Sequence, residues 1–355
     1  MSNSLGKKIK IQIFGQSHSE AIGVVIDTPP AGIRLDMDKI CAFLKRRKGG
    51  NAISTPRSES DMPKIISGLA DGVTCMAPLC AIFENNDTRS KDYSSLKITP
   101  RPSHADYTAF IKSAGFNDIR GGGAFSGRLT LPLCFAGAVC MQILESYGIR
   151  IGAHICSIGN VKDTRFDPVS PELDLLDGKS FPVLNAEAGE KMTELILNVK
   201  EELDSVGGII ECAVTGVPVG IGEPMFDGLE NVIARAMFGI PAIKGIEFGS
   251  GFECATMRGS EHNDAMCYEG DRVVTKTNNA GGIVGGISNG MPIIFRVAVK
   301  PTPSIAREQQ TVDLVNKTDA RLSITGRHDP CIVPRAVPVV EAAAAIALLD
   351  AILSD

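Results

Sequence analysis

The sequence predicts an α+β fold, in which helices and strands are mixed along the chain. Strand and helix patterns follow one another with both hairpin and crossover connections, rather than in the regular order of a doubly wound sheet. No G-x-G-x-x-G motif opens a helix after an early strand, and no G-x-x-x-x-G-K-[ST] motif is present, which weakens dinucleotide-binding and P-loop interpretations. The 355 residues show no break in composition, so one large domain and two interleaved lobes fit equally well.

The first part of the chain predicts four strands and one helix. Apolar and polar residues alternate in the strands, as expected where one face is buried. The strands cover residues 10–14, 23–27, 65–69 and 79–83. Between the second and the third strand, Asp36 caps a helix that ends at Arg47 and whose apolar residues share one face. A polar connection, 84–104, follows, and loops of this length usually have a function.

The clearest helix covers 126–147, is apolar almost all round and closes at Gly148, so we expect it to be buried. Strands and amphipathic helices follow it. The strands are expected at 151–158, 208–217, 242–248 and 293–299, and the helices at 186–206, 229–238 and 337–353.

Composition and charge are typical of a globular protein of the cytosol. Hydrophobic residues make up 44% of the chain and charged residues 22%, and the net charge of -5 argues against a general nucleic-acid surface. No signal-peptide core and no run of eighteen apolar residues occur, so we expect a cytoplasmic protein without a membrane partner. The ten cysteines contain no C-x-x-C pair, so neither disulfides nor a metal site is expected.

Three of the five histidines lie in polar turns bounded by glycine or proline: His18, His104 and His328. Imidazole titrates near neutral pH, so two histidines in one pocket can protonate different groups in one reaction. Asp106 and Asp329 are candidates to orient them. A hydrogen bond to a loop carbonyl explains each of the three equally well, and His154 and His262 are expected to be structural.

Arginine is suited to binding phosphate and carboxylate, because its planar guanidinium donates paired hydrogen bonds and stays charged. Six arginines lie in turns or at helix ends, where they can face an anion: Arg46, Arg47, Arg101, Arg120, Arg128 and Arg327. Arg128 is the strongest candidate, since an apolar helix has little reason to begin with a buried cation unless an anion lies opposite. For Arg46 and Arg47, a solvated helix end is an equally good explanation.

Two loops have the composition of phosphate-binding sites. Gly121–Gly127 leads into the buried helix and can present backbone N–H groups to an anion, although glycine triplets occur equally in simple turns. Lys300–Ser304 follows a strand and supplies an ammonium and two hydroxyl groups. An ordinary proline-rich loop is its other explanation.

Three signatures, taken in order along the chain, resemble the chorismate synthase family. The first is Gly15-Gln16-Ser17-His18 with Asp27-Thr28-Pro29-Pro30-Ala31-Gly32, the second is Gly122-Gly123-Ala124-Phe125-Ser126-Gly127-Arg128-Leu129-Thr130, and the third is Gly326-Arg327-His328-Asp329-Pro330-Cys331 with Arg335-Ala336-Val337-Pro338. The resemblance extends from Phe14 nearly to the end of the chain. Ala124, Phe125 and Leu129 depart from the Arg, Ser and Glu that are common in the family.

The resemblance implies a single domain, residues 1–355, built as a β-α-β sandwich, and a homotetramer. It implies the reduced-FMN-dependent anti-1,4-elimination of phosphate and the C6 proton from 5-enolpyruvylshikimate-3-phosphate, a carbon-oxygen lyase reaction that yields chorismate. The FMN is reduced either by this chain with NADPH or by an external flavin reductase. A flavin oxidoreductase and an inactive phosphate-binding or assembly protein are the alternatives.

The resemblance also assigns roles to individual residues. Three are implied to be catalytic: His18 protonates the leaving phosphate, His104 protonates the flavin, and Asp329 assists the removal of the C6 proton. The implied substrate-binding residues are Ser17, Arg46, Arg47, Arg101 and Arg128. The implied FMN-binding residues are Ala124, Phe125, Ser126, Gly285, Lys300, Pro301, Thr302, Pro303, Ser304 and Arg327.

Overall fold

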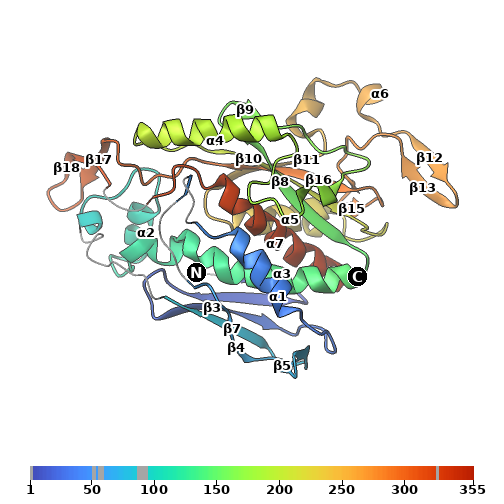
Figure 1. Ribbon diagram of the computed structural model, residues 1–355, viewed down its shortest axis with the longest axis horizontal. Coiled ribbons are helices and arrows are strands. Elements are labelled where there is room, and N and C mark those ends of the chain that lie inside the picture. The colour runs from blue at the N-terminus through green and yellow to red at the C-terminus, as the bar shows by residue number, and fades with distance from the viewer. Residues whose placement is uncertain (1–2, 50–52, 55–59, 86–94, 325–327) are drawn as a thin grey trace.

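Two five-stranded sheets enclose a layer of helices in the computed structural model of the chain (Figure 1). The structure describes residues 3–49, 53–54, 60–85, 95–324 and 328–355. Neighbouring strands are antiparallel in both sheets. The predicted α+β class and its arrangement as a β-α-β sandwich are therefore confirmed.

The first sheet has the strand order β1-β2-β3-β7-β4. Its strands are β1 (Ser4–Leu5), β2 (Lys10–Gly15), β3 (Ala21–Asp27), β7 (Leu79–Glu84) and β4 (Lys64–Ser67). Along β3, the alternating side chains of Ile22, Val24 and Ile26 are fully buried. Because alternate residues of a strand point to one face, this face is the one that packs against the helices.

The second sheet has the strand order β11-β16-β10-β8-β9. Its strands are β11 (Ile243–Phe248), β16 (Ile293–Val299), β10 (Gly208–Thr215), β8 (Arg150–Ile158) and β9 (Val161–Lys162). Most residues of β8, β10 and β16 are buried. Helix α4 (Ala186–Glu201) runs along the outer side of this sheet, where it contacts β8 and β9 (Figure 1).

The helical layer consists of α1 (Met37–Arg46), α3 (Thr130–Ser146), α5 (Leu229–Phe238) and α7 (Val333–Ile352). Helix α3 packs on the first sheet and α7 on the second. A Cβ atom at Gly137 would lie 2.2 Å from the Cβ of Ala342, so only glycine permits this close approach of the two helices. Arg47 contacts Thr130 at the start of α3 and Arg335 in the first turn of α7. The two buried helices therefore begin at the same end of the molecule.

Shorter elements complete the fold around these layers. Two are helices, α2 (Asp106–Lys112) and α6 (Gly259–His262). Four are hairpins: β5 (Leu69–Ala70) with β6 (Val73–Thr74), β12 (Met266–Glu269) with β13 (Arg272–Thr275), β14 (Ile283–Val284) with β15 (Ile287–Ser288), and β17 (Gln309–Asp313) with β18 (Thr318–Leu322). The β12–β13 hairpin projects from the body of the molecule (Figure 1).

One carboxylate joins the two ends of the described chain. Asp350, near the end of α7, accepts hydrogen bonds from the backbone N–H groups of Lys7, Lys8 and Ile9 at 2.7–3.0 Å. These residues lead directly into β2. The last helix therefore fixes the position of the chain segment that enters the first sheet.

Among the residues that the structure describes, one helical stretch, 127–146, is long and apolar enough to span a membrane. It contains α3, whose residues 130–140 are all buried in the core. Helix α3 lies between the first sheet and α7, which accounts for its apolar composition. The prediction that this helix is buried is confirmed.

Most predicted elements are present, and the errors lie at their ends. Helix α5 and strand β16 have the predicted bounds. The predicted helix 186–206 is too long, because Leu203 has a φ of +62° and α4 already ends at Glu201. The predicted helix 337–353 begins too late, since Pro334 lies in the first turn of α7, where its missing N–H costs no hydrogen bond. Helix α2 and the four hairpins were not predicted.

Candidate active site

Polar turns from distant parts of the chain meet at the end of the molecule where α3 and α7 begin. The turn after β2, which contains Ser17 and His18, lies against the loop Arg120–Phe125 that precedes α3. The backbone N–H of Ser17 donates a hydrogen bond to the carbonyl oxygen of Gly123 at 3.1 Å. The sequence-predicted turn and glycine loop are therefore neighbours in space.

Three consecutive glycines shape this loop. Gly121, Gly122 and Gly123 have φ values of +59°, +85° and +54°, which favour glycine. A Cβ atom at Gly121 would lie 2.4 Å from Ser17 Oγ and 2.8 Å from His18 Nε2, and one at Gly122 would lie 3.4 Å from His104 Nε2. The structure thus brings His18 and His104 against adjacent residues of one loop.

Asp106 fixes the orientation of the His104 ring. Its Oδ1 lies 2.6 Å from His104 Nδ1, and its two oxygens accept hydrogen bonds from Arg101 at 2.7 and 2.8 Å. Burial opposes the charge on Asp106, but the hydrogen bonds from Arg101 and His104 outweigh burial and hold the pKa of this carboxyl far below its ordinary value. An ionised carboxylate only accepts hydrogen bonds, so Nδ1 of His104 carries the proton and Nε2 faces Gly122.

Arg101 connects the His104 turn to the candidate FMN loop. It is buried, and its Nη1 donates a hydrogen bond to Ser304 Oγ at 3.0 Å. Lys300 Nζ donates to the carbonyl oxygen of Ser103 at 2.9 Å. Residues 300–304 therefore lie against the same turn as His104. Most of the guanidinium of Arg101 is occupied by protein acceptors.

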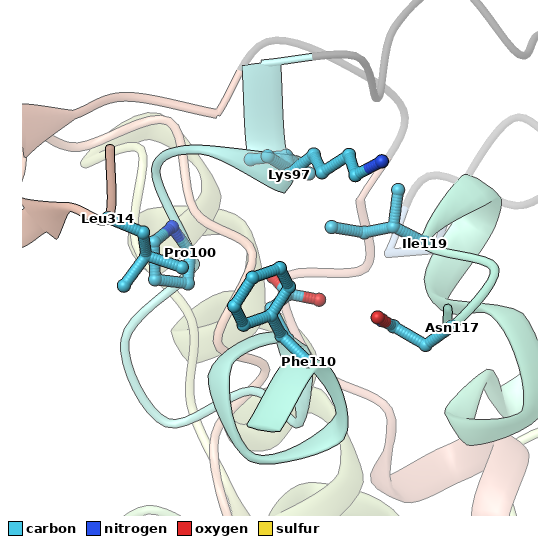
Figure 2. Close-up of a pocket in the computed structure, with 8 residues that line it drawn as sticks. Lys97, Pro100, Phe110, Asn117, Ile119 and Leu314 are labelled. Atoms are coloured by element: carbon cyan, nitrogen blue, oxygen red, sulfur yellow. The ribbon is translucent and has the colours of Figure 1, made fainter. Parts of the chain in front are cut away.

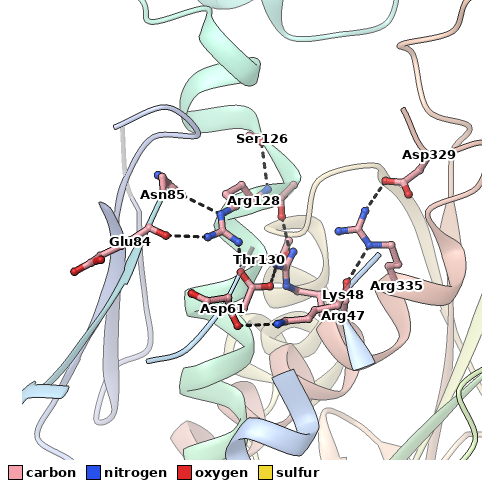
Figure 3. Close-up of polar contacts among 12 residues, drawn as sticks. Arg47, Lys48, Asp61, Glu84, Asn85, Ser126, Arg128, Thr130, Asp329 and Arg335 are labelled. Atoms are coloured by element: carbon pink, nitrogen blue, oxygen red, sulfur yellow. Dashed lines mark hydrogen bonds and ion pairs between the residues drawn. The ribbon is translucent and has the colours of Figure 1, made fainter. Parts of the chain in front are cut away.

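Two other arginines share one carboxylate near the start of α3 (Figure 3). Arg47 and Arg128 are both buried, and Arg47 Nη2 donates to Asp61 Oδ2 at 3.0 Å, while Arg128 Nη1 donates to Asp61 Oδ1. Burial lowers the pKa of Arg47 to about 10, although the charge of Asp61 acts in the opposite direction. Sequence reasoning missed Asp61, which lies in a polar stretch without a recognisable motif.

Asn85 connects this arginine pair to the His18 turn. Its side-chain oxygen accepts a hydrogen bond from Arg128 Nε at 3.0 Å, and its Nδ2 donates to the carbonyl oxygen of Ser19 at 2.8 Å. The amide thus holds the cation of Arg128 and the backbone next to His18 in fixed relation. Asn85 directly follows β7, and the sequence analysis assigned no role to it.

The third predicted turn adjoins the same region. Arg335 donates to Asp329 Oδ2 at 2.5 Å and, through Nε, to the carbonyl oxygen of Arg47 at 2.9 Å (Figure 3). Burial lowers the pKa of His328, and the nearby charge of Arg101 lowers it further. Asp329 and His328 therefore lie next to residues of both other clusters.

Two predicted site residues do not join this cluster of turns, and a third lies outside the described residues. The guanidinium of Arg46 is held by both oxygens of Glu341, at 2.6 and 2.9 Å, where α1 meets α7. Gly285 lies in the turn of the β14–β15 hairpin, where the neighbouring Gly286 packs against Glu223 and Gly228 rather than against the three predicted turns. Arg327 lies outside the described residues.

Four buried polar side-chain atoms of the described chain have no hydrogen-bond partner in the protein: Ser17 Oγ, Arg47 Nε, Thr302 Oγ1 and His328 Nε2. All four belong to the turns and loops that meet at this site. Buried polar atoms in proteins are nearly always hydrogen-bonded, so these atoms indicate where a polar ligand binds. Their chemistry, together with Lys300, fits the phosphate and carboxylate groups of a flavin nucleotide and an acidic substrate.

A small cavity lies beside α2 (Figure 2). Phe110, Asn117, Ile119 and Leu314 are among the residues that line it. Its volume of about 10 Å³ is about enough for one water molecule. This cavity is too small for a metabolite, and Asp106, which holds His104 and Arg101, is one of the residues that line it.

A family model described as chorismate synthase matches residues 9–353. The chain belongs to the chorismate synthase family. A protein named chorismate synthase from Lancefieldella parvula is 46% identical over 368 aligned residues, covering 100% of this chain and 97% of the relative. Another of that name, from Pyrococcus abyssi, is 47% identical over 348 residues, with coverages of 98% and 97%. A crystal structure of a chorismate synthase is similar, with a TM-score of 0.77, 29% identity and coverages of 98% and 93%.

Membership of the chorismate synthase family confirms the resemblance deduced from the three signatures. The matched region contains all three of them. The predicted class, a carbon-oxygen lyase of aromatic biosynthesis, follows from this membership.

Proposed function

We propose that this chain converts 5-enolpyruvylshikimate-3-phosphate into chorismate by anti-1,4-elimination of phosphate and the C6 proton, with reduced FMN as cofactor. One observation carries the proposal: the rings of His18 and His104 lie against consecutive glycines of one loop, beside buried arginines. A reaction that expels phosphate and removes a proton from another carbon needs proton-transfer groups and cations within one pocket.

The leaving phosphate is assigned to the His18 side of the loop. His18 supplies a proton to the departing oxygen, and the buried, unpaired hydroxyl of Ser17 donates a hydrogen bond to it. Arg47 and Arg128 stabilise the negative charge that develops on the phosphate. The guanidinium groups of Arg46 and Arg101 are largely bound by Glu341 and Asp106, so neither offers a free binding face to the substrate.

The flavin is assigned to the His104 side. When bound, reduced FMN lends electron density to the substrate ring and regains it, so that no net oxidation occurs. Lys300, Thr302 and Ser304 would hold its phosphate, with Pro301 and Pro303 shaping the loop and Ala124, Phe125 and Ser126 lining the opposite wall. His104 in its doubly protonated form, with Nδ1 held by Asp106, would supply a proton from Nε2 to the flavin ring, and Asp329 would assist the removal of the C6 proton. Gly285 would reach an FMN only from another copy of the chain.

The proposal also covers the oligomeric state of the protein, its location in the cell and the reductant that supplies electrons to FMN. The chain forms a homotetramer in the cytoplasm and acts without a membrane or nucleic-acid partner. The exposed side chains of the β12–β13 hairpin support an assembly of several copies, as argued below. FMN is reduced either on this chain by NADPH or by a separate flavin reductase.

An anaerobic assay tests the proposed function. Purified protein is mixed with photoreduced FMN and 5-enolpyruvylshikimate-3-phosphate, and chorismate and inorganic phosphate are measured. We expect equal amounts of both products without NADPH, and no product with oxidised FMN. A parallel reaction with oxidised FMN and NADPH shows whether the chain reduces its own cofactor.

A flavin oxidoreductase is the alternative that the same assay excludes or supports. Such an enzyme would consume one reductant for each product molecule and would release no phosphate. Turnover of many substrate molecules for each photoreduced FMN therefore supports the lyase. Stoichiometric consumption of reduced FMN would overturn the proposal.

A further inference from the structure

Asp61 holds the two arginines that we assign to the substrate's anionic groups. One of its carboxylate oxygens accepts from Arg47 at 3.0 Å and the other accepts from Arg128. Asp61 is 6% exposed, and both arginines are buried around it (Figure 3). A carboxylate in this position presents two oxygens to two guanidinium groups, as a phosphate or carboxylate ligand would.

The cluster carries more positive than negative charge even with Asp61 in place. Two guanidinium groups face one carboxylate, and Arg335 and Lys48 add positive charge nearby. Burial lowers the pKa of Arg47 to about 10, and its Nε is a buried donor without a protein partner. A further anion in this place would therefore be bound favourably.

Asp61 has a left-handed backbone conformation, which is unfavourable for a residue with a side chain. Its φ is +53°, in the left-handed region that non-glycine residues seldom adopt. Hydrogen bonds to the two arginines keep it there, because the surrounding structure must compensate for such a conformation. Loss of these bonds would let the residue relax to an ordinary backbone conformation.

We propose that Asp61 is an internal counter-ion that occupies the binding face of Arg47 and Arg128 until an oxyanion of the substrate replaces it. The inference rests on the proposed function, because it assumes that these arginines bind the substrate's phosphate or carboxylate. Asp61 keeps two like charges together in the ligand-free protein, and it competes with the ligand for the same hydrogen bonds. The substrate's affinity is thereby lowered, while the site stays preformed.

Binding of inorganic phosphate to the full-length protein tests this inference. Calorimetric titration compares the wild type with Asp61→Asn, which removes the charge, and with Asp61→Gly, which also suits the positive φ. Asp174→Asn is the matched control, because it removes one exposed carboxylate that pairs with Arg150 away from the site. We expect both Asp61 variants to bind phosphate at least tenfold more tightly, about 1.4 kcal/mol, and the control to bind as the wild type does.

A double variant locates the bound phosphate. Adding Arg47→Gln to Asp61→Asn should abolish the gain, since one of the two donors is then absent. If the Asp61 variants are partly unfolded, their thermal midpoints should rise with phosphate concentration more steeply than that of the wild type. Phosphate affinity that is equal or weaker in both Asp61 variants, or a gain that persists in the double variant, overturns the inference.

The two proposals fail separately. Chorismate formation by the wild type with no phosphate effect of Asp61 overturns the counter-ion alone. A tenfold gain in phosphate affinity with no chorismate from the wild type overturns the proposed reaction alone.

Discussion

Gly121 and Gly122 determine how closely the two site histidines approach one loop. Both glycines have positive φ values, and a side chain at either would point at an imidazole ring. A Cβ atom at Gly121 would come within 3 Å of both Ser17 and His18. The glycines thus provide space for the rings as well as a left-handed turn.

The Gly121→Ala variant should lose much more elimination activity than Gly148→Ala, although both variants should lose similar stability. The Cβ atom at position 121 must displace His18 or Ser17. Gly148 has a similar positive φ, +77°, but a Cβ atom there would meet nothing within 4 Å. Both variants should lose about 1–2 kcal/mol of stability from the left-handed backbone. Urea unfolding and the anaerobic assay measure the two effects. Equal activity losses in both variants would show that the contact with His18 is unimportant.

Replacing either site histidine should abolish most of the activity. We expect His18→Ala and His104→Ala each to lower kcat by about 100–10,000-fold, the usual contribution of a positioned acid. His262→Ala is the control, since His262 lies in α6, away from the site (Figure 1). Rates are measured anaerobically with photoreduced FMN. If elimination survives both substitutions, the acid roles assigned to these residues are wrong.

The residue types found in turns predicted part of the site, but they did not predict which side chains form ion pairs with one another. His18, His104 and Arg128 could be singled out because imidazole and guanidinium groups in glycine-bounded loops suggest acid and anion chemistry. Asp61 could not, since its partners Arg47 and Arg128 lie 14 and 67 positions away and no periodicity connects them. The ion pair between Arg46 and Glu341, which lies 295 positions further along the chain, could not be predicted either.

At the level of elements, a buried network of charges joins four strands of the second sheet. His154 on β8 lies 3.1 Å from Asp163 and 3.0 Å from Glu211 on β10. Glu211 also accepts from Arg296 on β16, which in turn donates to Glu247 on β11 at 2.6 Å. His154 is fully buried, which agrees with its expected structural role. The network ties β8, β10, β16 and β11 together by their side chains.

The pH dependence of stability should report this network. Burial alone would lower the pKa of His154, but the two carboxylates outweigh burial and raise the pKa above the ordinary value of 6.5. A raised pKa in the folded state means that the stabilisation is complete below about pH 6.5 and is lost as pH rises through the folded-state pKa. Urea unfolding between pH 6 and 9 should therefore show a loss of stability in the wild type that His154→Gln lacks. His262→Gln should follow the wild type, and identical slopes in all three proteins would contradict the expectation.

Strong periodicity predicted the elements well, while weak local patterns did not. The amphipathic α5 and the apolar β16 were placed at their observed bounds because one pattern governs each of them. Helix α2 has only seven residues, too few for a reliable period. The hairpins of two to five residues per strand depend on their turns and on tertiary packing, which a hydrophobic pattern does not reveal.

At the scale of the whole molecule, the projecting β12–β13 hairpin is the surface where we expect copies of the chain to meet in the proposed tetramer. It is a separate two-stranded sheet, and such sheets are marginally stable alone. Met266 and Tyr268 on β12 are 76% and 79% exposed. Large apolar side chains on an isolated hairpin favour burial against another protein surface.

Substitutions on this hairpin should weaken the proposed tetramer. We expect Met266→Asp with Tyr268→Asp to shift the protein towards smaller species, because charged side chains are costly to bury at an interface. Val315→Asp, at an equally exposed position in the β17–β18 turn, is the control. Light scattering after size-exclusion chromatography gives the masses. A tetramer that persists in the double variant would place the assembly surface elsewhere.

The carboxylate of Asp350 also has a consequence for how the enzyme is made. It binds Lys7 across 343 positions of the chain, so the ribosome must add nearly all residues before this contact can form. At about 5–20 residues per second, that interval is roughly 20–70 s. During translation, the segment that enters the first sheet waits for the last helix, whereas the apolar face of β3 packs against α3, which is made much earlier. The contact that fixes the entry into the first sheet can therefore form only after α7 has been synthesised.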